Sequence, residues 1–159
     1  MRYSLIESFT GFLSTVMLII SCLFAPVIGV AQCESEADNL FNQAVASLNE
    51  SQHATAADLF EKSAEKEFSC ANPRYDDLIY ELQNAISCYR YLNNVEKSIS
   101  LTTKLIEVYN LQGKNAGVLE SKLMLCELLR LKNDEAALST ILSTVYHQSK
   151  AENNASLQF

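Results

Sequence analysis

From residue 35 onward, apolar residues recur every three or four positions, and polar residues fill the places between them. This is the period of an amphipathic α-helix whose apolar stripe faces a core. Short breaks rich in Asn, Gln, Gly or Pro divide the pattern into six segments. The predicted helices cover about Ser35–Leu48, Ala54–Ser69, Tyr75–Leu92, Val95–Leu111, Ala116–Leu131 and Asp134–Ser149.

The breaks between these segments hold two to five residues. Connections this short force neighbouring helices to run antiparallel. Only 4 Gly, 2 Pro and no Trp occur in 159 residues, which disfavours a sheet built on tight turns. We therefore expect an all-α fold of three antiparallel helical hairpins in a row.

The second helices of the three hairpins open alike, with "HATAADLFEKS", "VEKSISLTTKL" and "DEAALSTILST". A small residue near the start lets the partner helix approach closely, and a bulkier one four positions later fills the gap between hairpins. Steps of 42 and 39 residues separate the small positions. The small residues are Ala56, Ser98 and Ala137, and the bulkier ones are Phe60, Thr102 and Ile141.

This pattern resembles the tetratricopeptide repeat family, in which an aromatic residue and then Ala or Ser follow a small residue of the second helix. Ala56, Phe60 and Ser63 match those places, and Leu40 and Ala44 match the first helix. The match is best over residues 36–64. Later repeats keep Tyr89, Ser98 and Ala137, but they place Ile86 and Leu125 where a small residue is usual, and both steps exceed the family's period.

The resemblance implies that the hairpins stack into a short α-solenoid whose groove holds a protein or peptide. The family's carboxylate clamp is absent, because Phe41, Val45, Leu119 and Leu123 occupy all its places except that of Asn84. Aromatic and cationic groove residues suit an acidic ligand, although an ordinary solvated helix face explains them equally well. The resemblance assigns to the groove Tyr80, Gln83, Asn84, Ser87, Arg90, Tyr91, Lys122 and Arg130, together with Phe41, Val45 and Cys126.

The N-terminal 31 residues are typical of an export signal. Arg2 precedes the apolar run "GFLSTVMLIISCLF", and the small residues Gly29 and Ala31 suit cleavage before Gln32. The uncharged stretch 11–31 is also long enough to anchor the chain in a membrane, and "IISC" allows a lipid on Cys22. The expected organisation is a signal or anchor over 1–31, a helical domain over 32–152 and a flexible tail over 153–159.

Acidic residues outnumber basic ones by 19 to 12, and their distribution is uneven. Residues 34–81 hold 11 acidic and 3 basic residues, whereas residues 82–159 hold 7 and 8. With no basic run, nucleic acid is not an expected partner. An acidic solvated face explains the first half more simply than head-to-tail association does.

Sequence motifs for catalysis, metal binding and phosphate binding are missing from the chain. His53 and His147 fit surface positions, and Asp76 and Asp77 complement a helix N-terminus. We therefore expect neither enzymatic activity nor a cofactor.

The cysteines give the sharpest structural expectation. Cys33 precedes the first helix and Cys70 follows the second, so an antiparallel hairpin brings them to one end, where a disulfide can form. Cys88 and Cys126 fall inside apolar helix segments and suit buried free thiols.

Together these features predict an exported scaffold, periplasmic, extracellular or anchored outside the cytoplasm, that binds a protein or peptide. Self-association through the open ends of the solenoid is compatible with this function. A membrane contact is expected only through residues 11–31, if they are retained. Two alternatives stay open: the stalk or sensory part of a membrane-anchored regulator, and a small helical enzyme inhibitor.

Overall fold

In the computed structural model, which describes residues 32–156, the chain forms helices only. The first helix occupies residues 32–49. It is followed by α2 (His53–Ser69), α3 (Tyr75–Tyr91), α4 (Val95–Leu111), α5 (Asn115–Lys132) and α6 (Glu135–Ser156). The predicted all-α class is confirmed, and the predicted signal or anchor lies outside the described residues.

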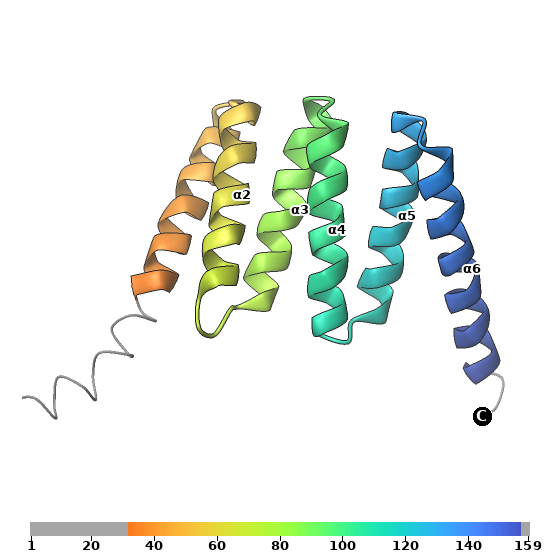
Figure 1. The fold of residues 1–159 in the computed structure, drawn as a ribbon. Coiled ribbons are helices and arrows are strands. Elements are labelled where there is room, and N and C mark those ends of the chain that lie inside the picture. Colours follow the sequence, from red (N-terminus) through yellow and green to blue (C-terminus); the bar gives the residue numbers. More distant parts are fainter. Residues whose placement is uncertain (1–31, 157–159) are drawn as a thin grey trace, which may run out of the picture.

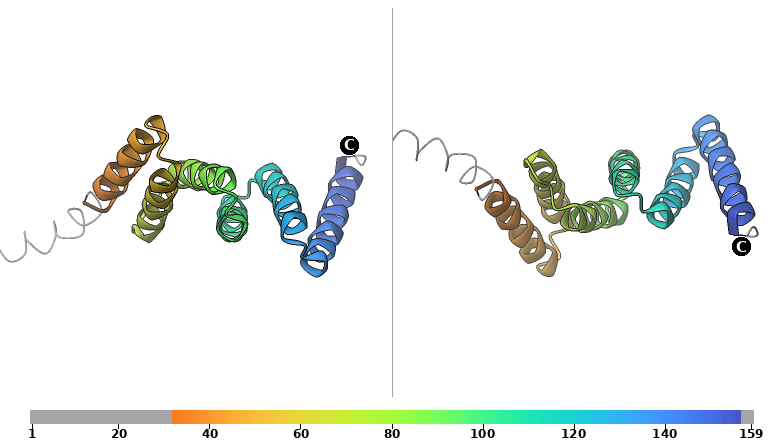
Figure 2. Two further views of the ribbon diagram at one scale, coloured as in Figure 1. Left: turned by 90° about the horizontal axis from the view of Figure 1, so that it is seen from above. Right: turned by 90° about the horizontal axis from the view of Figure 1, so that it is seen from below.

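The helices stand side by side in a single antiparallel row, from the first helix at one end to α6 at the other (Figure 1). The views along the helix axes show the chain zigzagging from one helix to the next (Figure 2), and side chains also meet between the first helix and α3, between α2 and α4, and between α3 and α5. Among the labelled helices, the main contacts join consecutive ones. The first helix, α3 and α5 therefore run parallel to one another.

Four of the five connections use one type of turn, in which a residue with positive φ ends the preceding helix. These residues are Ser51, Asn93, Gly113 and Asn133, with φ between 56° and 65°. After each, the next backbone N–H bonds to a carbonyl five residues earlier, as in the Schellman motif; Asn94 N to Tyr89 O, at 2.8 Å, is one case. The connection from α2 to α3 is different, because it begins with an extended Cys70 and contains Pro73.

The core is centred on α2, α3 and α4, with α3 buried on the sides that face its neighbours. Phe60, which is 1% exposed, lies edge-on to Phe41, with ring centroids 5.7 Å apart. Ala56 is fully buried, so the small residue does lie where helices approach closely. Of the predicted packing residues, Ala44, Ala56, Phe60, Ser63, Tyr89 and Ser98 are buried, whereas Leu40, Ala137 and Ile141 are half-buried.

The last helix differs most from its predicted bounds. It continues to Ser156, past the predicted end at Ser149 and into the stretch assigned to a flexible tail. The added sequence "KAENNAS" contains no Gly or Pro, so nothing in it stops a helix. Within the described chain α6 packs mainly on α5, which explains why Ala137 and Ile141 keep partial exposure.

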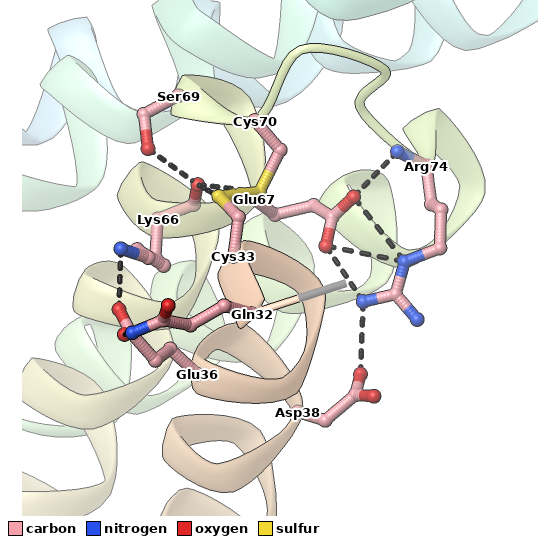
Figure 3. Close-up of a disulfide and its surroundings, with 9 residues drawn as sticks. All are labelled: Gln32, Cys33, Glu36, Asp38, Lys66, Glu67, Ser69, Cys70 and Arg74. Carbon is pink, nitrogen blue, oxygen red and sulfur yellow. Dashed lines mark hydrogen bonds and ion pairs between the residues drawn. A yellow bond between two sulfur atoms is a disulfide. The ribbon is translucent and has the colours of Figure 1, made fainter. Parts of the chain in front are cut away.

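Cys33 and Cys70 form a disulfide, with Cα atoms 5.8 Å apart. The bond closes the end of the hairpin made by the first helix and α2 (Figure 3). The prediction for this pair is confirmed. Cys88 and Cys126 are buried free thiols, and burial raises the pKa of both.

Candidate functional site

One face of α3 carries most of the residues predicted to line a groove. Their spacing places them within about a third of the helix circumference. Tyr80 and Tyr91, three turns apart, are 56% and 68% exposed. The six residues on this face are Tyr80, Gln83, Asn84, Ser87, Arg90 and Tyr91.

Both tyrosines contact the preceding hairpin while remaining open to solvent. The Tyr80 ring lies 5.8 Å from that of Phe41 on the first helix. The Tyr91 ring lies 4.0 Å from the imidazole of His53, at the start of α2. Aromatic rings at such distances pack favourably, so these contacts orient two exposed side chains on the same face.

The polar residues between the tyrosines are engaged within the protein. Ser87 Oγ donates to Gln83 O and Asn84 Nδ2 to Tyr80 O, both at 2.8 Å, as intrahelical contacts. Gln83 Nε2 donates to Tyr109 Oη on α4 at 3.1 Å. The central part of the face is therefore already ordered.

The cations of the predicted groove are divided between two places. Arg90 lies 3.7 Å from Glu127 and joins α3 to α5, while Arg130 is exposed on α5. Lys122 donates to Gln148 Oε1 on α6 at 2.9 Å. Arg90 and Arg130 are thus the solvent-accessible cations of the predicted groove. Lys122 instead links the two helices of the last hairpin, α5 and α6.

A small pocket between the first helix and α3 was not predicted from the sequence. Its volume is about 160 Å³, smaller than the pockets that hold drug-sized ligands. Two aromatic rings and three carboxyl groups line it. The lining residues are Asp38, Phe41, Asp77, Tyr80 and Glu81.

Glu81 is the most unusual residue of this pocket, because it is an acid only 3% exposed. Ser63 Oγ lies 2.5 Å from Glu81 Oε1 and 2.9 Å from Ala37 O. A hydroxyl has one proton and cannot donate to both acceptors. A proton on Glu81 resolves this, since Glu81 then donates to Ser63 and Ser63 donates to Ala37 O.

The surroundings of Glu81 favour that proton. Burial, reinforced by the charges of Glu67 and Asp77, raises its pKa to about 7, against the opposing effects of Ser63 and Arg74. Its second oxygen, Oε2, is buried and has no hydrogen-bond partner. Glu81 is therefore partly protonated near neutral pH.

Arg74 is the cation closest to this group of acids. Its backbone N–H and guanidinium bind Glu67, which is completely buried, with the shortest guanidinium contact at 2.7 Å (Figure 3). The guanidinium also reaches Asp38 at 2.8 Å and Asp77 at 3.1 Å. Arg74 lies in the α2–α3 connection, next to the disulfide. Its ion pairs link this connection to the first helix and to α3.

A second pocket, of about 220 Å³, lies between α2 and α4 over α3. Its lining is mainly apolar and includes the exposed side chains of Phe68 and Leu111. Lys104, paired with Glu65 at 3.3 Å, stands at its edge. This pocket contains no group with an evident chemical role.

Neither a metal site nor a membrane-crossing helix occurs in the part of the chain that the structure describes. No cluster of three or more His, Cys, Asp or Glu residues there is arranged to hold a metal ion. None of the described helices combines the length and apolar character needed to cross a bilayer.

Glu81 does leave a signal in the sequence. It lies three residues after Leu78 and four before Ala85, on the side of α3 that packs inward. An acid at such a position needs a partner or a proton. The sequence does not show that Ser63 and Ala37 meet it there.

Comparison of the chain with protein-family models, with curated proteins and with solved structures found no match.

Proposed function

We propose that this chain is an exported, non-enzymatic scaffold of tetratricopeptide-like repeats that binds a protein or peptide along the exposed face of α3. The main support is the contrast between the two sides of that helix. One side is buried by α2 and α4, whereas the other exposes Tyr80, Arg90 and Tyr91. Exposed Tyr and Arg are the residue types that contribute most to protein interfaces.

Export is proposed on two further observations. The Cys33–Cys70 disulfide suits an oxidising compartment outside the cytoplasm. Residues 1–31 have the composition of a signal segment. An intact-mass measurement of the exported protein tests this: a chain that begins at Gln32 supports cleavage, and retention of Met1 favours an anchor.

Site-specific photo-crosslinking tests the binding face. A photoreactive benzoylphenylalanine replaces Tyr91 on α3 in one variant and Thr103, an exposed residue on α4, in the control. We expect a specific adduct from position 91 only. The captured protein is then purified, and Tyr91→Ala is expected to weaken its binding about tenfold. Equal adducts from both positions, or unchanged affinity, would contradict the proposed face.

A further inference from the structure

The pocket between the first helix and α3 carries more negative charge than its environment neutralises. Asp38, Asp77 and Glu81 line it, and Glu67 lies behind Glu81. Arg74 is the cation that pairs with Asp38, Glu67 and Asp77. Even when Glu81 is protonated, one guanidinium cannot balance the other three carboxyl groups, so the pocket attracts positive charge.

Acidic residues alone do not make a binding site, but Glu81 adds an independent observation. The residue is 97% buried, lines the pocket, and leaves Oε2 without a hydrogen-bond partner. Buried carboxyl oxygens are normally paired, because an unpaired one costs free energy. An unsatisfied acceptor at the wall of an acidic pocket is suited to a donor from outside the chain.

The aromatic lining indicates the shape of that donor. The rings of Phe41 and Tyr80 pack against each other, with centroids 5.8 Å apart, and both line the pocket, where they can attract methylene groups and cations. A flexible side chain with an apolar stem and a charged end matches this arrangement. The pocket volume of about 160 Å³ accommodates one such group rather than a larger molecule.

We propose that this pocket binds one basic side chain, a lysine or an arginine, of the partner, with its stem against the Phe41–Tyr80 pair and its charge on Asp77 and Glu81. The inference rests on the proposed partner-binding function and specifies the chemistry of the bound segment. Entry to Oε2 requires a side chain at the rim to rotate, and the exposed Tyr80 is the side chain we expect to do so.

This site also changes the expected charge of the partner. The aromatic and cationic residues of the groove suggest an acidic ligand, but the end of the groove between the first helix and α3 is acidic. Arg90 and Arg130 are accessible away from the pocket, in the last turns of α3 and α5. A partner segment that places a basic residue in the acidic pocket and acidic residues near Arg90 and Arg130 fits both parts of the groove.

Binding of the cation is coupled to the proton on Glu81. A lysine or arginine keeps its charge throughout the neutral range, whereas Glu81, whose pKa is about 7, must lose its proton to pair with it. Asp38, Glu67, Arg74 and Asp77 are the other charged groups around it. Because deprotonation precedes pairing, affinity should rise as pH increases through 7.

The test uses the purified processed chain and three short peptides, Ac-Gly-Gly-Xaa-Gly-Gly-NH₂, with Xaa as lysine, arginine or norleucine. Amide chemical shifts report binding at residues 38, 77, 80 and 81. We expect saturable shifts with lysine or arginine and none with the uncharged norleucine peptide. The tighter of the two basic peptides identifies the side chain. The dissociation constant should fall about tenfold from pH 6 to pH 8.

Four variants separate this site from general electrostatic attraction. Asp77→Asn should weaken binding at least about fivefold, while Glu120→Gln, an equal charge change at an exposed site on α5, should leave it unchanged. Glu81→Gln should remove the dependence on pH. Tyr80→Ala alters only the exposed rim, so it tests the site even if a core variant fails to fold.

Equal binding of the norleucine peptide, or equal weakening by Glu120→Gln, would overturn the proposed site. So would an affinity for the basic peptides that does not change between pH 6 and pH 8. If these tests fail while position 91 still crosslinks to a partner, only the basic pocket is wrong and the proposed scaffold function stands.

Discussion

Ser63 and Glu81 connect α2 to α3 in the protein interior, with Ser63 Oγ 2.5 Å from Glu81 Oε1. The same hydroxyl lies 2.9 Å from Ala37 O, so three helices meet at one oxygen atom. Protonated Glu81 satisfies this contact, and ionised Glu81 competes with Ala37 O for the single hydroxyl proton. The contact among the first helix, α2 and α3 therefore depends on one buried proton.

We first predict that stability decreases as pH rises through the neutral range. The pKa of Glu81 is raised to about 7 in the folded chain, so between its ordinary value of 4.5 and 7 the folded state binds more protons than the unfolded state. This contribution is complete below pH 4.5 and is lost as pH passes 7, to a total of at most about 3 kcal/mol.

Urea unfolding at pH 5 and at pH 8 measures this effect. In Glu81→Gln the same comparison should show a smaller loss, because the glutamine has no proton to release. Glu120→Gln serves as the control, and it should retain the full pH dependence. Parallel behaviour of the native chain and Glu81→Gln would show that Glu81 titrates normally.

The second prediction concerns the core at the interface of the first helix, α2 and α3. Phe60→Ala should lower the free energy of unfolding by roughly 3–5 kcal/mol, because the buried ring leaves a cavity. Ala56→Leu should cost roughly 1–3 kcal/mol by overpacking a fully buried position. Ala137→Leu is the matched control on the half-buried α6 and should cost less than Ala56→Leu. Denaturant melts that rank these variants differently would contradict the packing.

The third prediction concerns the disulfide. Replacing both Cys33 and Cys70 by Ser should lower the free energy of unfolding by roughly 3–4 kcal/mol, because a loop with a sequence separation of 37 residues is no longer closed in the unfolded chain. Reductant should destabilise the native protein by a similar amount and have no effect on the double variant. Peptide mapping without reductant that finds both thiols free would show that the bond does not form.

The fourth prediction exploits the close approach of α4 and α5. A Cβ atom at Gly117 would lie 2.6 Å from ring atoms of Tyr109, so Gly117→Ala should cost roughly 1 kcal/mol despite alanine's better helix propensity. In a Tyr109→Ala background the same substitution should instead stabilise by up to about 1 kcal/mol. Thermal melts of the four chains measure this change of sign.

A second glycine provides the control for this cycle. Gly113 has φ of +65° and no atom near its missing Cβ. Gly113→Ala should therefore destabilise both backgrounds equally, through backbone strain alone. If Gly117→Ala has the same effect with and without the Tyr109 ring, the close contact is not present.

The sequence was sufficient to predict the helices and the disulfide for identifiable reasons. Helix periodicity and breaks such as "CANPR" depend on local backbone chemistry, and α4 begins and ends as predicted at Val95 and Leu111. The Cys33–Cys70 pair followed from the antiparallel connection alone. The end of α6 was predicted too early because no residue after Ser149 marks a definite stop.

The acidic pocket could not be predicted in the same way. Its lining residues come from two helices, and the Glu81–Ser63–Ala37 contact from three. Their meeting depends on how the helices are rotated against one another, which apolar periodicity defines only to within a broad stripe. For the same reason, the sequence grouped Lys122 with the groove residues on α3, whereas in the structure Lys122 contacts α6.

The single row of helices gives the two ends of the molecule opposite dynamic properties. At one end, a covalent bond holds the first helix to α2, and the buried Glu67, paired with Arg74, lies beside it. At the other end, α6 has no fully buried residue among those described and packs mainly on α5. We therefore expect local opening to start at α6 and proceed toward α4, with amide hydrogen exchange fastest in α6 and slowest across α2 and α3.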